Sequence, residues 1–365
     1  MTIALTYNVK HTRSSTSLTA QNEAEFDSPE TVEALKKALE SENHKVIKIE
    51  ADDSAYSRFQ TLKNEIDIVF NVSEGLRGQA RESQIPAILE MLNIPYTHSG
   101  VLAQAVTLDK ALTKKILTFH GISTPKFLLI RQIRQISPIL TQVSRELSYP
   151  LIVKPNSEGS SKGIFNKNLV FDEKKLSERI AWLLKTFKQP VIIEEFLSGR
   201  EFTVSILGNS PPKVLPIVEQ NFEVFPENMP HFASYEAKWL FEDELPNPHD
   251  AYFCPAPIDK NLKIKIDNIC LAAWDALELK DVARIDLRLD HDGNPSILEV
   301  NTLPGLISDP NIVTYLPIAA RKAGYTYETL VNTILNEALK RYGLLKSSKS
   351  HIHIAPKPLI LTEEK

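Results

Sequence analysis

The chain has 365 residues, of which 42 are Lys or Arg and 46 are Asp or Glu, so its formal net charge at pH 7 is −4. A charge so near neutrality excludes the strongly basic proteins that bind nucleic acids or anionic membranes. The hydrophobic content of 42% is sufficient for a large core, and the length predicts two or three lobes of roughly 100–150 residues each.

Targeting and cysteine patterns favour a cytoplasmic protein. Residues 1–7 form a short strand pattern without the basic flank or long apolar run of a signal peptide. No segment approaches the ~20 apolar residues that cross a membrane. Cys254 and Cys270 are the only two cysteines, so no disulfide framework is expected. We therefore expect no membrane partner and no nucleic-acid partner.

Strand and helix patterns alternate along the N-terminal part of the chain. Ser28 and Pro29 predict a helix start, with Ser as the cap and Pro at the first helical position. This alternation is typical of a doubly wound α/β lobe, which we assign to residues 1–106. The expected strands are 2–7, 46–49 and 66–70, and the further expected helices are 83–92 and 107–119.

The chain from residue 124 to residue 345 is predicted to form a small central lobe, about residues 124–207, and a C-terminal lobe, about residues 208–345. Residues 221–257 are rich in Pro and aromatic residues and lack periodicity, which favours a mobile loop. The tail, residues 346–365, is expected to be flexible. The expected strands are 151–154, 164–171, 191–195 and 201–207, and the expected helices are 173–187, 259–278, 313–322 and 326–342.

A predicted β-hairpin at residues 284–301 carries the strongest chemical signal. Apolar and polar residues alternate along its first strand, and Asp292-Gly293 is a hairpin turn signal. If Asp290 pairs with Pro295, the same register gives two further pairs: Asp286 with Glu299, and Arg284 with Asn301.

Two carboxylates that face each other, as Asp286 and Glu299 do in this register, repel. A bound divalent cation would remove the repulsion, and Asp, Glu and Asn oxygens are ligands that Mg²⁺ prefers. We interpret Asp286, Glu299 and Asn301 as a magnesium site, provided that a nucleotide-binding region exists elsewhere. An ordinary solvated hairpin face is the alternative, and it leaves the apolar Pro304-Gly305 loop after Asn301 unexplained.

Residues 159–163 are rich in Gly and carry two hydroxyls, which allows two functional interpretations. Their backbone N–H groups could enclose phosphates, and Lys154, at the end of an apolar strand, would be costly there unless it faced an anion. The segment also matches G-x-S-x-G, which would make Ser161 a hydrolase nucleophile. That turn requires a helix immediately afterwards, whereas residues 164–171 look like a strand. A flexible surface turn would explain the glycines alone.

Residues 192–201 are a second candidate for nucleotide binding. They form a strand that leaves through Ser198-Gly199, where backbone edges can bind adenine and a carboxylate can hold ribose hydroxyls. Such a segment alone is more often an ordinary turn with charged neighbours. Neither a Walker A motif nor G-x-G-x-x-G occurs, which excludes a P-loop and a dinucleotide-binding fold.

Together these segments resemble the D-alanine–D-alanine ligase family of ATP-grasp enzymes over nearly the whole chain. The set is specific in its order and spacing, although each string alone is weak. The matching strings are Leu108-Asp109-Lys110, Lys154-Pro155 with Glu158-Gly159-Ser160-Ser161, Glu194 with Ser198-Gly199 and Glu201-Phe202-Thr203-Val204, Tyr235-Glu236-Ala237-Lys238, Cys254-Pro255-Ala256, Arg284-Ile285-Asp286, and Glu299-Val300-Asn301 with Pro304-Gly305.

The resemblance implies an α/β protein with the ATP-grasp fold, in which residues 107–345 sandwich ATP between two lobes. It implies a ligase that depends on ATP and Mg²⁺, with Mn²⁺ as a possible substitute. Such an enzyme joins two small amino-acid-type substrates through an acyl phosphate, as in peptidoglycan biosynthesis, and is often a homodimer. Residues 221–257 would be the lid that shields the acyl phosphate from water.

The resemblance also implies the roles of individual residues. Asp286, Glu299 and Asn301 match the metal ligands, while Arg284 and the Gly305 amide match the groups that stabilise the tetrahedral intermediate. Glu25, with Asp27 as a rival, corresponds to the glutamate that binds the substrate amine. The residues matched to ATP binding are Lys110, Lys154, Ser160 and Ser161 for the phosphates; Glu194, Glu195 and Leu197 for adenine; Glu201 for ribose; and Lys238 on the mobile loop. Ser160 is also matched to the catalytic centre.

Departures from the family pattern fall on the amino-acid pockets. Trp239 follows Lys238 where the family often has a tyrosine that links the lid to the phosphate loop. Pro310-Asn311 takes the place of a Ser-Leu pair, and residues 71–75 stand where a His-Gly segment is common. A ligase for D-alanine, a related ligase with other substrates and a non-catalytic ATP-binding relative therefore remain open.

Overall fold

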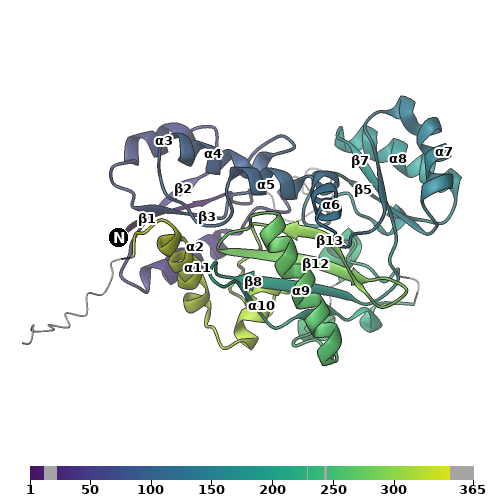
Figure 1. The fold of residues 1–365 in the computed structure, drawn as a ribbon. Helices are drawn as coiled ribbons and strands as arrows, with labels where there is room; N and C mark the ends of the chain where they lie inside the picture. The colour runs from purple at the N-terminus through teal and green to yellow at the C-terminus, as the bar shows by residue number, and fades with distance from the viewer. Residues whose placement is uncertain (12–22, 228, 242–244, 346–365) are drawn as a thin grey trace, which may run out of the picture.

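The structure, a computed structural model, describes residues 1–11, 23–227, 229–241 and 245–345. The tail at residues 346–365, expected to be flexible, lies outside the described residues. The described chain forms three lobes, each with its own sheet (Figure 1). None of its helices is long and apolar enough to cross a membrane.

The N-terminal lobe contains a parallel three-stranded sheet in the order β2-β1-β3, as the alternating pattern predicted. Ser28 caps the first helix, because its side chain accepts a hydrogen bond from the Thr31 amide. Ile3 and Leu5 pack against this helix, whereas Ala4 packs on the opposite face of the sheet. The elements are β1 (Thr2–Tyr7), α2 (Pro29–Glu40), β2 (Lys45–Glu50), α3 (Ala55–Leu62), β3 (Ile68–Asn71) and α4 (Gln84–Met91).

The helix predicted at residues 107–119 is confirmed from residue 110 onwards, but residues 107 and 108 belong to a separate preceding helix, so the structure has two helices here. They are α5 (Val101–Leu108) and α6 (Lys110–Phe119), and they are separated by Asp109. Asp109 leaves the helical conformation at φ −84° and ψ 97°, and its side chain accepts from the Leu112 amide as an N-cap. This break makes Lys110 the first residue of a helix.

The central lobe has an antiparallel sheet in the order β4-β7-β5-β6 with two covering helices, of which the sequence predicted only the one at residues 173–187. The strand predicted at residues 164–171 is wrong, because only its last part pairs. The Asn168 side chain accepts from the Phe165 amide and donates to the Gly163 carbonyl, which holds the chain in a 3-10 turn. The elements are β4 (Phe127–Ile130), α7 (Ile136–Glu146), β5 (Leu151–Pro155), β6 (Leu169–Val170), α8 (Glu173–Phe187) and β7 (Val191–Glu195).

The C-terminal lobe is built on a sheet in the order β11-β10-β8-β12-β13, with β9 beside β8. The strand predicted at residues 201–207 belongs to this sheet and not to the central lobe, because it is β8 and pairs with β12 along its whole length. We therefore propose a lobe boundary near Gly199. The elements are β8 (Glu201–Leu207), β9 (Lys213–Val214), β10 (Val218–Gln220), β11 (Tyr252–Phe253), α9 (Lys260–Ala276), β12 (Val282–Leu289), β13 (Pro295–Asn301), α10 (Tyr315–Lys322) and α11 (Tyr327–Arg341).

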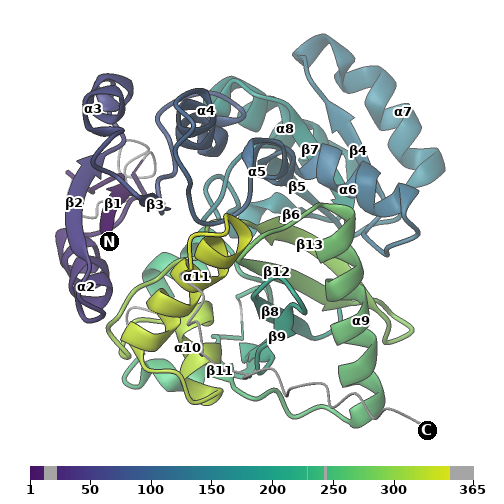
Figure 2. The ribbon, with the colours of Figure 1, turned by 60° about the vertical axis from the view of Figure 1, so that its left-hand side comes forward.

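The helices of this lobe cover both faces of its sheet (Figure 2). Helix α9 packs on one face together with α6, and helices α10 and α11 pack towards the N-terminal lobe. The described part of residues 221–257 is not one uniform loop. It contains 3-10 turns at Phe222–Val224 and Pro248–Ala251 and a short π-helix at Ala237–Phe241.

Candidate active site

Two adjoining cavities lie where the three lobes meet. A wide cavity of about 740 Å³ lies between the N-terminal lobe and the C-terminal lobe, within the range of small-molecule sites. A narrow cavity of about 100 Å³ lies between the central sheet and the C-terminal sheet. Both cavities are lined by Glu158, Ser160, Lys238, Arg284, Glu299 and Tyr315.

The structure brings all the candidate site residues to these cavities. The shared wall contains Ser160, Lys238, Arg284 and Glu299. The other candidates line the narrow cavity (Lys154, Ser161, Glu194, Glu195, Leu197, Glu201 and Asp286) or the wide one (Glu25, Asp27, Lys110, Asn301 and Gly305).

A buried chain of charges forms the back of the narrow cavity. Lys154 Nζ donates to Glu194 Oε2 at 2.9 Å, and Lys114 Nζ lies 3.3 Å from Glu194 Oε1. Burial lowers the pKa of Lys114 to about 8, although the nearby Glu194 carboxylate raises it. Burial would also lower the pKa of Lys154, but Glu194 outweighs it and the pKa is raised. Lys154 is therefore charged at neutral pH, and its ammonium borders the cavity.

Glu194 and Glu201, the residues matched to adenine and ribose, both line the narrow cavity. Glu194 Oε1 lies against Lys114 and Glu194 Oε2 against Lys154, so this carboxylate holds both lysines at the back of the cavity. Glu201 pairs with Arg288 Nη1 at 3.2 Å. Sequence reasoning missed Arg288, although its spacing from Arg284 and Asp286 along one strand places all three on the same face.

The hairpin places the proposed metal ligands together. Asp286 faces Glu299 and Arg284 faces Asn301, as the predicted register required. The predicted pair of Asp290 with Pro295 is wrong, since Leu289 pairs with Pro295. The final register is nevertheless the predicted one, because the ladder shifts by one residue between the turn and the site.

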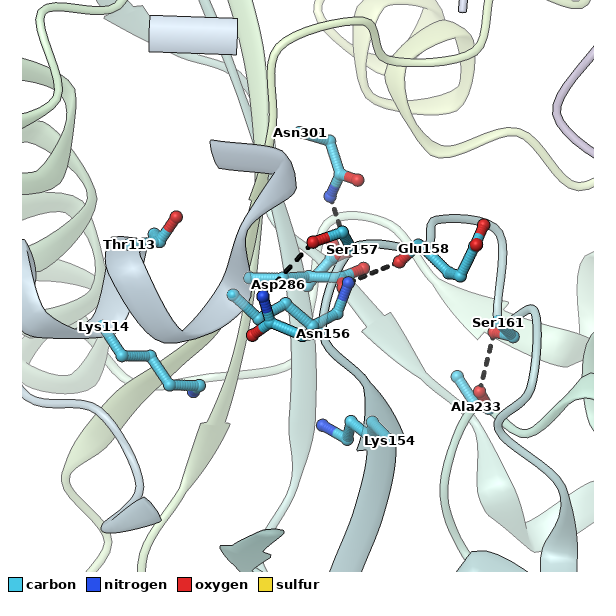
Figure 3. Close-up of polar contacts among 12 residues, drawn as sticks. Thr113, Lys114, Lys154, Asn156, Ser157, Glu158, Ser161, Ala233, Asp286 and Asn301 are labelled. Carbon is cyan, nitrogen blue, oxygen red and sulfur yellow. Dashed lines mark hydrogen bonds and ion pairs between the residues drawn. The ribbon is translucent and has the colours of Figure 1, made fainter. Parts of the chain in front are cut away.

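The donor set of this hairpin fits a hard divalent cation. Asp286 Oδ2 accepts from Asn301 Nδ2 at 3.2 Å (Figure 3). The same oxygen accepts from Arg284 Nη2 at 2.8 Å. Burial would raise the pKa of Glu299, but Lys110, Arg284 and Lys154 lower it to about 2, so its carboxylate is charged. Two carboxylates and an amide oxygen suit Mg²⁺ or Mn²⁺, if the Asn301 amide turns its oxygen inward. No group of three His, Cys, Asp or Glu side chains in the described residues is arranged to hold a metal.

Lys110, the first residue of α6, connects this hairpin to the phosphate loop, which we define as residues 156–163. Its Nζ donates to the Glu158 carbonyl at 2.5 Å and lies 3.2 Å from Glu299 Oε2. The side chain is 5% exposed. An ammonium in this position can contact an anion in the wide cavity, which Lys110 lines beside Glu299.

The phosphate loop has the left-handed backbone of an anion-binding turn. Ser160 and Ser161 have φ values of 49° and 58°, and successive amides in such turns can converge on phosphate. Ser161 Oγ donates to the Ala233 carbonyl at 2.9 Å (Figure 3). No helix follows Ser161 directly, so the hydrolase interpretation lacks the strand–turn–helix geometry that it requires.

The loop after Ala233 is joined to the phosphate loop region by further bonds. The Tyr235 amide donates to the Ile164 carbonyl at 2.6 Å, and the Asn166 amide donates to Glu236 at 3.0 Å. The rings of Phe165 and Tyr235 are 5.7 Å apart. These contacts connect the two segments without the tyrosine hydroxyl that this chain lacks beside Lys238.

Sequence reasoning missed Thr314, which lines the wide cavity, and the pair Arg81 and Lys162, which binds Glu25 on the wall of that cavity. Thr314 Oγ1 is buried and has no hydrogen-bond partner in the described chain. Thr314 is the N-cap of α10, and the usual donor to an N-cap side chain is the amide N–H of the third helical residue. Here that residue is Pro317, which has no amide hydrogen. Arg81 and Lys162 both bind Glu25. No local sequence signal reveals Arg81, which is distant from Glu25 in the chain.

Comparisons with known proteins agree with this arrangement. The family model described as D-ala D-ala ligase C-terminus matches residues 116–336. The D-alanine–D-alanine ligase of Carboxydothermus hydrogenoformans is 34% identical over 309 residues, which cover 84% of this chain and 91% of that protein. The uncharacterized protein y4sG of Sinorhizobium fredii is also 34% identical, over 84% of this chain and 86% of its own length.

Solved structures show the same fold. The D-alanine–D-alanine ligase of Bacillus anthracis in complex with ATP has a TM-score of 0.68 and 24% identity, over 94% of this chain and 99% of that one. The VanG D-Ala:D-Ser ligase of Enterococcus faecalis has a TM-score of 0.67 and 20% identity, over 92% and 99%. The family model and the relatives together show that this chain belongs to the D-alanine–D-alanine ligase family.

Proposed function

We propose that this protein is an ATP-dependent ligase that joins two amino-acid-type substrates by an amide bond. The supporting observation is the wall that the two cavities share, where Ser160, Arg284 and Glu299 border both. A phosphate held in the narrow cavity would therefore lie next to a carboxylate held in the wide one. Because ATP is the proposed substrate, we also propose a cytoplasmic location.

The residues at this wall provide the charges that the reaction needs. Lys110 and Lys154 would bind the phosphates in place of Glu299 and Glu194, their present partners. A divalent cation at Asp286, Glu299 and Asn301 would neutralise phosphate charge. A substrate carboxylate attacks the γ-phosphate, which gives an acyl phosphate and ADP. The amine of the second substrate then attacks the acyl carbon, loses a proton and displaces phosphate.

Two parts of the chain would protect and stabilise the reacting groups. Phe232, Ala233 and Lys238, from the long loop, form part of the narrow cavity's wall, where they would exclude water from the acyl phosphate. Arg284 and the Gly305 amide would donate to the oxyanion that forms at the acyl carbon.

The substrates are tested by measuring phosphate release from ATP with pairs of D- and L-amino acids, with mass spectrometry of the product. D-Alanine on both sides is our first candidate, since several relatives are D-alanine–D-alanine ligases. That assignment fails if D-alanine gives no dipeptide while another pair turns over. ATP binding without phosphate release for any pair would instead indicate a non-catalytic relative.

A further inference from the structure

An ion cluster joins the N-terminal lobe to the phosphate loop beside the wide cavity. Glu25 and Arg81 come from the N-terminal lobe, and Glu158 and Lys162 come from the phosphate loop. Glu25 Oε2 accepts from Arg81 Nη2 at 2.8 Å and from Lys162 Nζ at 2.6 Å. The same two cations reach Glu158 Oε2, Lys162 at 2.7 Å and Arg81 at 3.3 Å. Each carboxylate is therefore shared by cations from both lobes.

The cluster also binds the backbone of the loop. Arg81 Nη1 donates to the Ser157 carbonyl at 2.9 Å, and Gln189 donates to Glu158 Oε1 at 2.7 Å. The side chains of Arg81, Glu25 and Lys162 are each less than 10% exposed. Burial would raise the pKa of Glu25, but Lys162 and Arg81 lower it to about 2. The cluster thus joins two carboxylates to two basic side chains, and only Glu158, at 16% exposure, is appreciably open to solvent.

Glu25 also contacts the loop directly at Gly159. A Cβ atom at residue 159 would lie only 2.2 Å from Glu25 Oε1. The absence of a side chain at this position therefore allows the carboxylate to lie against the loop backbone. The position of Glu25 and the path of the phosphate loop depend on each other.

We propose that Glu25, Arg81, Glu158 and Lys162 form an interlobe clamp that positions the phosphate loop, and that Glu25 is a positioning residue instead of the receptor for a substrate ammonium. The proposal rests on the ligase function proposed above, since it names what Glu25 does in that site. An ammonium at Glu25 would lie beside two cations that already bind it, and would be repelled. Glu74 and Glu82 line the same cavity and have no ion pair in the described part of the chain. Burial and the nearby Glu25 raise the pKa of both carboxyls, that of Glu82 to about 7, and a substrate cation bound beside them would favour their charged forms.

Hydrogen–deuterium exchange on the full chain without ligands tests the clamp. Glu25→Gln and Lys162→Met are expected to raise the exchange rates of the amides at residues 157–164 at least tenfold. Lys162→Arg keeps the charge and should remain close to the parent protein. Gly159→Ala keeps all four charges but displaces Glu25, so it should also raise these rates. Glu74→Gln, on the same cavity wall, is the matched control and should leave them unchanged.

Exchange in β1 and β12 reports whether each variant remains folded. If Glu25→Gln does not fold, the loop exchange rates of Lys162→Met and Gly159→Ala test the clamp in its place. Unchanged loop exchange in these variants would overturn the clamp. In ADP-release assays with ATP and D-alanine, the clamp predicts that Glu25→Gln lowers kcat/KM for both substrates. An increase confined to the KM for D-alanine, with unchanged exchange, would instead make Glu25 the ammonium receptor. The exchange measurement needs no turnover, so it still tests whether the clamp positions the phosphate loop if the ligase proposal fails.

Discussion

Asp286 and Glu299 face each other across the β12–β13 ladder, although the turn between these strands is one residue longer than the sequence predicted. Leu289 pairs with Pro295, and Leu298 is left without a partner between Ile297 and Glu299. This bulge at Leu298 restores the register. Bulges reorient side chains near functional sites, and this one keeps both carboxylates on the cavity wall.

The first prediction concerns the metal ligands. Glu299→Gln and Asn301→Ala should weaken the Mg²⁺ dependence and lower turnover together, because each removes an oxygen that we assign to the cation. A loss of roughly 10–100-fold in apparent metal affinity is the minimum expected, since even outer partners of metal sites have effects of that size. Titration of Mg²⁺ at saturating ATP measures it. Unchanged turnover at limiting Mg²⁺ would show that the hairpin does not bind the metal.

The second prediction concerns Arg284. Arg284→Met should lower kcat by about 10²–10³-fold, as expected for the loss of an oxyanion donor, with a small change in the KM for ATP. Arg284→Lys keeps the charge but cannot bind Asp286 through two nitrogens. Its kcat should therefore lie between the values of the parent protein and Arg284→Met. Arg58→Met removes a half-buried arginine that is paired with Asp52 and lines neither cavity, and it is the control. Equal activity in Arg284→Met and Arg58→Met would exclude the proposed role.

The sequence predicted the geometry of the hairpin well because strand alternation is a local property with a period of two. Ile285, Leu287 and Leu289 are buried as the pattern required, and the polar residues between them line the narrow cavity. The same alternation, followed to the end of the strand, also places Arg288 on the polar face of the hairpin. The break between α5 and α6 was also encoded locally, since Asp109 is a typical N-cap.

The interlobe contacts could not be predicted in this way. Arg81 and Lys162 meet at Glu25 from three separate parts of the chain, and no periodicity connects such positions. The assignment of β8 failed for a related reason. Its composition predicts a strand, but the choice between the central sheet and the C-terminal sheet depends on pairing with β12, which is distant in sequence.

The third prediction concerns pH and stability. Glu25 has a pKa of about 2 in the folded chain against an ordinary value of 4.5, so the unfolded chain binds more protons between these values. Its contribution to stability is present above pH 4.5 and is lost as the pH falls towards 2. Glu25→Gln should therefore lower the free energy of unfolding by roughly 3 kcal/mol at pH 7 and by little near pH 2.

Urea unfolding of both proteins at pH 7, 4.5 and 3 measures this difference. Glu42→Gln, at an exposed site, is the control and should stay within about 0.5 kcal/mol of the parent protein at each pH. A difference for Glu25→Gln that is the same at pH 7 and pH 3 would show that the charge of Glu25 is not what stabilises the lobes.

The last prediction separates the ligase from the hydrolase interpretation at Ser161. Its hydroxyl donates to the Ala233 carbonyl, so Ser161→Ala should loosen the contact between the phosphate loop and the long loop without removing a reacting atom. A lost hydrogen bond of about 1 kcal/mol predicts an approximately fivefold decrease in kcat/KM for ATP. Ser144→Ala, at an exposed helix position, is the control. Complete loss of activity in Ser161→Ala alone would favour a serine nucleophile, whereas a partial loss with a raised KM for ATP is what a hydroxyl that only joins two loops would produce.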